Sequence, residues 1–175
     1  MSGAAPAAAA EAPPAGRRPR LGPRLRACLD LCPTEGPVLD VGSAHGLLAR
    51  ALRARDAALV VYASESKPGP AAELRRLAGG DPGLRILEGA GLGPACGRGC
   101  RGAVIAGLGG HTIGAILQAD AELAAQLAWL CLQPAQGVGW LLAALPAWGY
   151  RLRAAARPVE RGRTYTALLV APPCA

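Results

Sequence analysis

The stretch that decides the fold is Pro37-Val-Leu-Asp-Val-Gly-Ser-Ala-His-Gly-Leu-Leu48. It opens with a short apolar run that predicts a buried strand over residues 38–41, and a helical pattern follows from about residue 45. Gly42 and Gly46 lie in the tight turn between the two. Glycine lets the backbone approach a ligand there, and the free N–H groups of the helix start favour an anionic or polar group. We therefore expect a nucleotide-binding turn.

On both sides of this turn, apolar runs of strand length alternate with helical segments. Further strands are predicted over residues 59–63, 84–87, 103–106 and 129–132. Helices are predicted over residues 22–31, 45–55, 70–77, 112–118 and 138–148, with a helical turn at 120–126. Two final runs, 151–159 and 164–170, flank a Glu-Arg-Gly-Arg turn and form an antiparallel pair. The pattern predicts an α/β, Rossmann-like class I methyltransferase fold: a seven-stranded sheet with an antiparallel C-terminal hairpin. A plain dehydrogenase would end with another parallel strand.

The length and composition fit one domain. The chain has 175 residues, 51% of them hydrophobic and only 3% aromatic, so its core must be built from Leu, Val, Ile and Ala. Residues 1–16 are rich in Ala and Pro and are expected to be disordered. Residues 17–175 are expected to form a single methyltransferase domain. The uncharged stretch 123–150 is long enough for a membrane span, but its Gln, Gly and Pro residues favour a strand, a turn and a helix.

The charge and the cysteines restrict the partners and the compartment. The net charge is +7, which suits a polyanionic partner, although a GC-rich coding sequence would also enrich arginine. The six cysteines follow neither a zinc-knuckle nor a disulfide spacing; the Cys96–Cys100 loop could clip a metal, but we expect no metal site. No export signal is visible. We expect a reduced, cytoplasmic protein.

Two acidic residues identify the nucleotide. Asp40 ends the first strand, where its carboxylate can meet the ammonium group of a cofactor, and Glu65 ends the second, at the distance at which an acid binds the ribose hydroxyls. The spacing D-x-G-x-A-x-G differs from the G-x-G-x-x-G of NAD-binding proteins and lacks the G-K-[ST] of a Walker A loop. S-adenosylmethionine is therefore the expected cofactor. The alternative is a purely structural turn with an incidental glycine.

The segments Val104-Ile-Ala-Gly-Leu-Gly-Gly-His-Thr-Ile113 and Leu130-Cys-Leu-Gln-Pro134 are more specific. Together with Arg24-Leu25, the loop from Asp40 to His45, Glu65, Gly69-Pro70 and Tyr165, they resemble the bacterial tRNA (adenine-22-N1)-methyltransferase family, the TrmK group. That family reads D-I-G-S-D-H, I-A-G-M-G-G and L-Q-P at these places. The order and approximate spacing hold from Leu21 to Val170.

The resemblance implies S-adenosylmethionine as cofactor, tRNA as partner, and methyl transfer to N1 of an adenine. It implies catalytic roles for His45, Gly107 and Gly109. The cofactor would contact Arg24, Asp40, Gly42, Ser43, Gly46, Glu65, Ser66, Gly89, Ala90, Gly91, Ala106, Gly107 and Leu108. The substrate would contact Gly109, Gly110, His111, Gln133, Pro134, Arg17, Arg18 and Arg20.

The sequence departs from the family at three places. Ala44 replaces the second Asp of D-I-G-S-D-H, Ala90 replaces the Asp of G-D-G-L, and we expect the C-terminal helical hairpin of typical members to be missing. Two alternatives therefore stand beside the active tRNA methyltransferase. One is a degenerate member that binds the cofactor or RNA without catalysis, and the other is a methyltransferase with another acceptor. An NAD-dependent oxidoreductase is disfavoured by the loop spacing.

Overall fold

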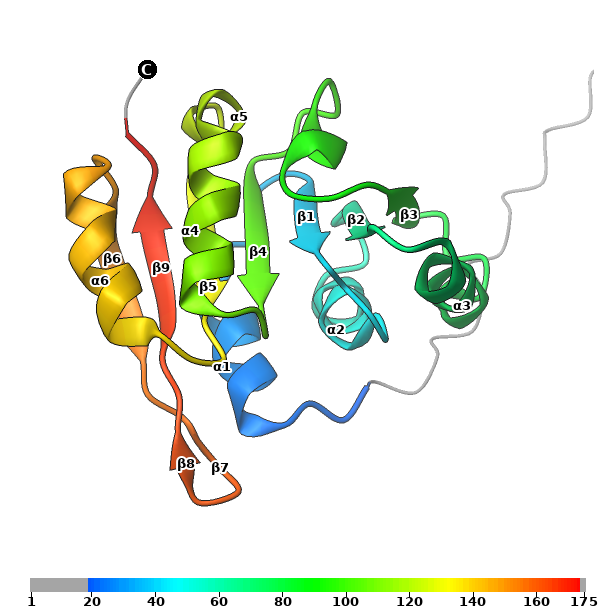
Figure 1. Cartoon of the computed structure of the whole chain (residues 1–175). Coiled ribbons are helices and arrows are strands. Elements are labelled where there is room, and N and C mark those ends of the chain that lie inside the picture. The colour runs from blue at the N-terminus through cyan, green and yellow to red at the C-terminus, as the bar shows by residue number, and fades with distance from the viewer. Residues whose placement is uncertain (1–18, 174–175) are drawn as a thin grey trace, which may run out of the picture.

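A seven-stranded sheet forms the centre of the computed structural model, which describes residues 19–173 (Figure 1). The predicted tail 1–16, Arg17 and Arg18 lie outside the described residues. The sheet order is β3-β2-β1-β4-β5-β9-β6, and the first five strands in chain order are parallel. Their bounds are β1 Val38–Val41, β2 Val61–Glu65, β3 Leu84–Glu88, β4 Gly102–Ala106 and β5 Trp129–Gln133.

The C-terminal part completes the sheet. β9 (Ala167–Ala171) lies between β5 and β6 (Arg151–Ala156) and runs antiparallel to both. This confirms the predicted α/β fold with seven strands and an antiparallel C-terminal hairpin. The pairing along the hairpin is interrupted where continuous strands 151–159 and 164–170 are predicted: β6 ends at Ala156 and β9 begins at Ala167, and β7 (Val159–Glu160) and β8 (Arg163–Thr164) pair in a separate two-stranded sheet at the tip.

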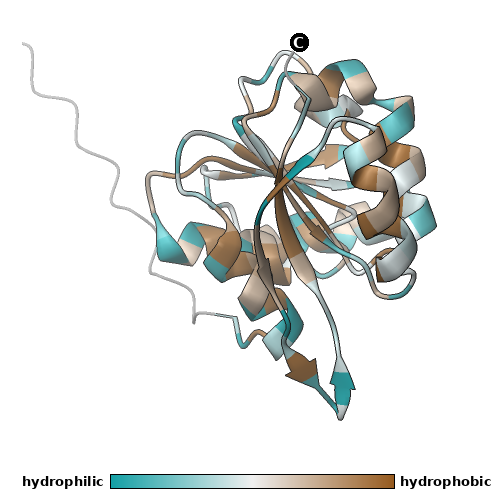
Figure 2. Cartoon of the chain, turned by 90° about the vertical axis from the view of Figure 1, so that its left-hand side faces the viewer, coloured by the Kyte–Doolittle hydropathy of each residue, from teal (hydrophilic) through white to brown (hydrophobic). Residues whose placement is uncertain are grey.

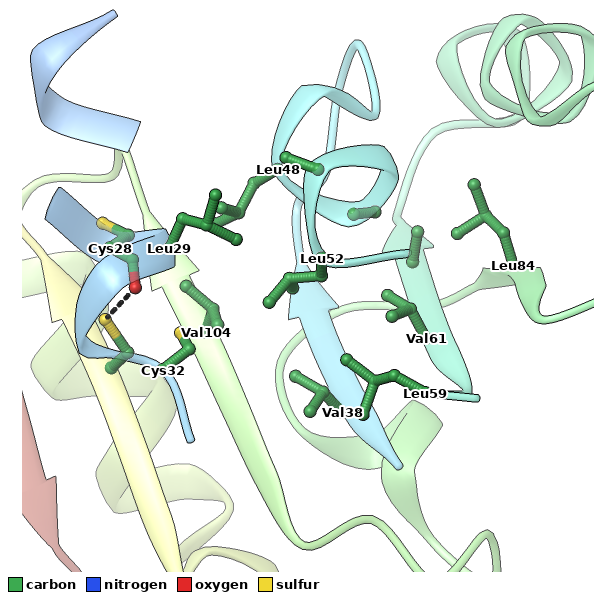
Figure 3. Close-up of a cluster of buried hydrophobic side chains, with 14 of the residues drawn as sticks. Cys28, Leu29, Cys32, Val38, Leu48, Leu52, Leu59, Val61, Leu84 and Val104 are labelled. Carbon is green, nitrogen blue, oxygen red and sulfur yellow. Dashed lines mark hydrogen bonds between the residues drawn. The ribbon is translucent and has the colours of Figure 1, made fainter. Parts of the chain in front are cut away.

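Helices cover both faces of the sheet. One face carries α1 (Pro23–Leu31), α2 (Leu47–Arg55) and α3 (Pro68–Ala78), and the other carries the short 3-10 helix η1 (Gly93–Ala95), α4 (Gly110–Ala119), α5 (Ala121–Ala125) and α6 (Val138–Ala147). Alternate residues of each strand enter opposite cores, since side chains alternate along a strand. Val38 and Val104 pack beneath α1 and α2 (Figure 3), whereas Leu39 and Ile105 pack beneath α4 and α6. Figure 2 shows these apolar strands between the helical layers.

Two predicted boundaries are wrong for local reasons. β2 begins at Val61 instead of residue 59, because the amide of Leu59 bonds back to the carbonyl of Asp56 and continues the turn after α2. α2 begins at Leu47 instead of residue 45, because Ala44 and Gly46 have left-handed φ angles of 39° and 64°. His45 therefore belongs to the loop and not to the helix.

The stretch 123–150 folds as predicted into a strand, a turn and a helix, β5 and α6. Across residues 19–173, no helix has the length and apolar character needed to cross a membrane. Three cysteines fill core space: Cys28 and Cys32 of α1 and Cys131 of β5 are buried, with 3.9 Å between the Cys131 sulfur and the Cys28 carbonyl (Figure 3). Within the same described range, no group of three His, Cys, Asp or Glu side chains could hold a metal.

Candidate functional site

The predicted cofactor loop closes over the end of β1. The amide of Ser43 donates to the carbonyl of Ser64 at 2.9 Å, which ties the loop to β2, and the amide of Gly46 donates to the carbonyl of Ser43 at 2.7 Å. Gly42 and Gly46 both have left-handed φ angles, 65° and 64°. The two glycines serve different purposes, because a Cβ at Gly46 would lie 2.7 Å from Leu74 Cδ1, whereas a Cβ at Gly42 would meet no described atom within 4 Å. The loop is thus packed at Gly46 and open at Gly42.

Asp40 is the buried acid of this site. Its side chain is only 4% exposed and accepts a 2.5 Å hydrogen bond from the Ser43 hydroxyl. Burial raises the pKa of Asp40 from 3.8 to about 6, and the bond from Ser43 offsets part of the rise. A cationic group at the mouth of the loop would stabilise the ionised carboxylate. The ammonium group of S-adenosylmethionine is such a group, so Asp40 and the open space above Gly42 fit this cofactor.

The next two strand ends add polar groups. Glu65 is partly buried at the end of β2, and its carboxylate accepts the amide of Lys67 at 3.1 Å and the hydroxyl of Ser66 at 3.3 Å. The amide of Gly89 bonds to the backbone carbonyl of Glu65 at 3.1 Å, which places the loop after β3 beside it. Glu65, Ser66 and Gly89 therefore come together along this edge.

The loop from Gly89 to Leu92 is held from behind by Asp120. The amide of Leu92 donates to the Asp120 carboxylate at 2.6 Å, and a Cβ at Gly91 would lie 2.2 Å from the same carboxylate. Gly91 is buried, and Ala90 is exposed. Ala90 cannot accept a hydrogen bond through its side chain, so only backbone groups of this loop are available to an adenine amine.

The glycine-rich loop after β4 is fastened to the loop after β5. The amide of Gly107 donates to the carbonyl of Gln133 at 2.9 Å, and the amide of Ala135 donates to the carbonyl of Leu108 at 2.7 Å. The amide of Gly110 then donates to the carbonyl of Gln136 at 2.8 Å. We call this pair of loops, residues 107–110 and 133–136, the loop clasp. Gly109 lies within the loop clasp, and Ala106, the last residue of β4, lies directly before it.

The loop clasp leaves room above one glycine. Gly107 has a φ angle of 81°, and a Cβ there would meet no described atom within 4 Å. The carbonyl of Leu108 is already an acceptor for Ala135, and that of Gly109 is an acceptor for Ile113. Each carbonyl has a second lone pair, so both can still accept from a substrate amine.

Arg24 joins three distant segments. Its guanidinium donates to the Gln133 side chain at 3.3 Å, pairs with Glu160 at 3.4 Å and lies 5.0 Å from the centre of the Tyr165 ring. The Glu160 carboxylate also accepts the backbone amide of Arg24 at 3.1 Å, so it caps the first turn of α1. Gln133 is fully buried and donates to the carbonyl of Pro134. Arg24 and Gln133 are thus in contact, although the resemblance assigns Arg24 to the cofactor and Gln133 to the substrate.

The two histidines lie on different sides of the site. His45 is exposed and close to α3: the pKa of Glu73 is lowered first by a hydrogen bond from Arg76 and also by the charge of His45. This places His45 on the α3 side of the loop, where a Cβ on the adjacent Gly46 would contact Leu74 of that helix. His111 is the second residue of α4, beside the clasp, and its ring stacks on Trp140 with 4.1 Å between centroids. Arg20, the one predicted substrate arginine among the described residues, is exposed just before α1.

The chain matches a family model. The model, described as a methyltransferase domain, matches residues 21–168. The chain belongs to this methyltransferase family. No curated protein matches it.

Solved structures of methyltransferases share the fold. Streptococcus pneumoniae Sp1610, a candidate tRNA (m1A22) methyltransferase solved with S-adenosyl-L-methionine, is 25% identical; the match covers 87% of this chain and 73% of that one, with a TM-score of 0.79. The Bacillus subtilis m1A22 tRNA methyltransferase TrmK is 24% identical over 89% of this chain and 68% of that one, with a TM-score of 0.77. Mycoplasma capricolum TrmK, solved with S-adenosyl-homocysteine, is 18% identical over 88% and 70%, with a TM-score of 0.76.

Sequence reasoning missed three residues of the site region: Asp120, Trp140 and Glu160. Asp120 and Glu160 act on residues 28 and 136 positions away in the chain, so no local pattern could reveal either partner. Trp140 had a weak signal, because a large aromatic in the first turn of an otherwise apolar helix is unusual in a chain with so few aromatics.

Proposed function

We propose that this S-adenosylmethionine-dependent methyltransferase transfers the methyl group to N1 of an adenine in tRNA. The observation that supports it is the loop clasp. It presents the Gly107–Gly110 backbone one strand away from Asp40 and the open Gly42 turn, so a planar base and the cofactor can meet there. The neighbour that is 25% identical carries the same proposed activity.

The cofactor supplies a methyl group that its sulfonium activates, so the chain has to bind and align. Asp40 would hold the ammonium group and Glu65 the ribose hydroxyls. The loop clasp would hold the adenine at a fixed distance, because its backbone hydrogen bonds leave the loop little freedom. Alignment alone can supply a large part of the rate enhancement when the two reactants are held together.

Ala44 supports a second candidate, a member that binds the cofactor without catalysis. It occupies the exposed centre of the cofactor loop, with a φ angle of 39°. An alanine there offers no carboxylate to stabilise a cationic methyladenine. Since Asp tolerates a left-handed φ better than Ala, Ala44→Asp would add this charge without straining the loop.

Radiolabel transfer from S-adenosylmethionine to bacterial tRNA tests the proposal. We expect label above a heat-inactivated control and a nucleoside digest in which it is N1-methyladenosine. Calorimetric binding of the cofactor without label on any RNA would select the binding protein. In that case, activity that returns in Ala44→Asp would assign the loss to this position. Label on another component of a cell extract, with none on tRNA, would indicate a different acceptor.

A further inference from the structure

The tip of the C-terminal hairpin extends past the sheet on the side of the candidate site. We call residues 157–166 the β7–β8 arm. The last sheet pair before it is Ala156 with Ala167, next to the carboxyl end of β5, where Leu132 pairs with Leu168. β7 and β8 then pair only with each other. Both views show the arm projecting from the body of the protein (Figures 1 and 2).

The arm is held in one orientation by contacts of Glu160, directly before the tip turn, and of Tyr165, nearer its base. Glu160 pairs with Arg24 and caps α1, and the centre of the Tyr165 ring lies 5.0 Å from the guanidinium of Arg24 and 5.3 Å from that of Arg163. The amide of Tyr165 also donates to the carbonyl of Pro158 at 2.9 Å. Because Arg24 also bonds to Gln133 in the loop clasp, the arm and the clasp form one connected structure.

The turn at the tip keeps an arginine in a strained conformation. Arg161 and Gly162 both have left-handed φ angles, 51° and 71°, which is the pattern of a two-residue type I′ hairpin. Asn, Asp or Gly is preferred at the first of these positions, and another side chain costs about 1 kcal/mol. Arginine here is therefore unfavourable for the turn, although it projects a cation from the outermost point of the arm.

The charge of the arm is positive. Arg157, Arg161 and Arg163 are all exposed, and the single acid, Glu160, is paired with Arg24 outside the arm. The only large apolar side chain that the arm exposes is Val159, at 59%. An arm that inserts into a membrane needs an apolar tip, whereas this tip is Arg-Gly-Arg. Arginine forks bind phosphate oxygens in two-pronged geometry.

We propose that the β7–β8 arm binds the phosphate backbone of the RNA substrate beside the base-binding loop clasp. The inference rests on the proposed function, because it assigns the partner of that same site. In it the arm holds the strand that leads into the site, and the cofactor pocket is not involved.

The test compares two double variants with equal losses of charge. Arg157→Gln with Arg161→Asn removes two cations of the arm and keeps the contact between Arg163 and the Tyr165 ring. The tip turn is also compatible with this variant, because Asn adopts a left-handed φ readily. Arg151→Gln with Arg153→Gln removes two exposed cations from β6, the same strand pair further from the site. Binding of an unmodified bacterial tRNA transcript is measured between about 50 and 200 mM salt, and cofactor affinity is measured by calorimetry.

We expect the arm variant to bind tRNA roughly tenfold more weakly. The magnitude of its slope of log K against log salt should be smaller by about 1.5, the change expected when two phosphate contacts are removed. The β6 variant should bind as the wild type does, and cofactor affinity should be unchanged in both variants. An arm variant that keeps the wild-type affinity and slope overturns the inference. An equal loss of tRNA affinity in the β6 variant also overturns the inference. An arm variant that self-associates while its tRNA binding is unchanged does so too.

The two proposals fail separately. If wild-type protein binds tRNA through the arm but places no methyl group on it, the arm inference stands and the proposed reaction is wrong. If tRNA is methylated at N1 of adenine and the arm variant has unchanged binding, the reaction stands and the arm inference is wrong.

Discussion

Replacing Asp40 by asparagine is expected to stabilise the ligand-free fold while weakening cofactor binding. Asp40 is buried, with no cation among its hydrogen-bond partners, and its pKa is raised from 3.8 to about 6. A rise of about two units corresponds to ~3 kcal/mol against the ionised form in the folded state. An amide carries no such penalty. The gain in the variant should be smaller than ~3 kcal/mol, because an amide also accepts a weaker hydrogen bond from Ser43 than a carboxylate does.

The size of this stability gain depends on pH. The penalty is complete above about pH 6, where Asp40 is ionised in both states, and it is absent below about pH 4, where both states are protonated. Asp40→Asn should therefore unfold at higher urea than the wild type at about pH 8, and the gap should close as the pH falls through this window. Urea unfolding of the cofactor-free proteins at several pH values measures this directly.

Asp81→Asn is the matched control with the opposite sign. The pKa of Asp81 is lowered, first by the hydrogen bond from Arg53, so ionised Asp81 stabilises the fold and its amide should be destabilising at about pH 8. A variant at Asp40 that is less stable than the wild type at about pH 8, or a gap that does not change with pH, would refute the reasoning. Calorimetry on Asp40→Asn should show a cofactor affinity lower by about tenfold or more, the usual cost of losing a charged partner.

Three further outcomes follow from the same site. Cofactor affinity of the wild type should fall about tenfold per pH unit below pH 6, since only ionised Asp40 pairs with an ammonium group; calorimetry that finds a flat profile from pH 5 to 8 would contradict this. Gly46→Ala should destabilise the fold by about 2–3 kcal/mol in urea, against about 1 kcal/mol for Gly79→Ala, because both have left-handed φ angles but only Gly46 faces buried Leu74. Gly110→Ala should sharply reduce methyl transfer, because its Cβ would lie 2.4 Å from the Gly137 carbonyl and force the loop clasp apart; Gly139→Ala, in open space on α6, should leave transfer intact and stabilise the helix by up to about 1 kcal/mol.

The parallel core of the fold could be predicted from the sequence because its signals are local. β1 is a short apolar run followed by a glycine turn, and the strand predicted over residues 38–41 has the observed bounds. The sequence predicts a start of β2 that is two residues too early, because Leu59 is apolar and buried but belongs to the turn after α2. Hydrophobicity alone cannot separate a buried turn residue from a strand residue. The turn of the β7–β8 arm follows from its Glu-Arg-Gly-Arg sequence, but the break between β6 and β7 does not, because a run of strand-like residues does not show where the pairing of two strands is interrupted.

The candidate site likewise has parts that the sequence predicts and parts that it does not. Asp40, Gly42 and Glu65 lie at the carboxyl ends of parallel strands, so their meeting at one edge could be inferred from topology. The side of the loop on which His45 lies could not, because it depends on the left-handed turn at Ala44 and Gly46. The bond between Arg24 and Gln133 likewise depends on how α1 packs on β5. Contacts of this kind are tertiary, and a single sequence carries no sign of them.

The cap that Glu160 places on α1 has a consequence for how the protein is made. The amide of Arg24 leaves the ribosome 136 residues before the carboxylate that satisfies it. At ~10 residues per second, the first helix waits on the order of ten seconds with its opening turn uncapped. The ion pair between Arg24 and Glu160 forms only after the segment that carries Glu160 has emerged. Helix α1 is thus synthesised well before the segment that caps it, and this part of the binding face is complete only after Glu160 has emerged.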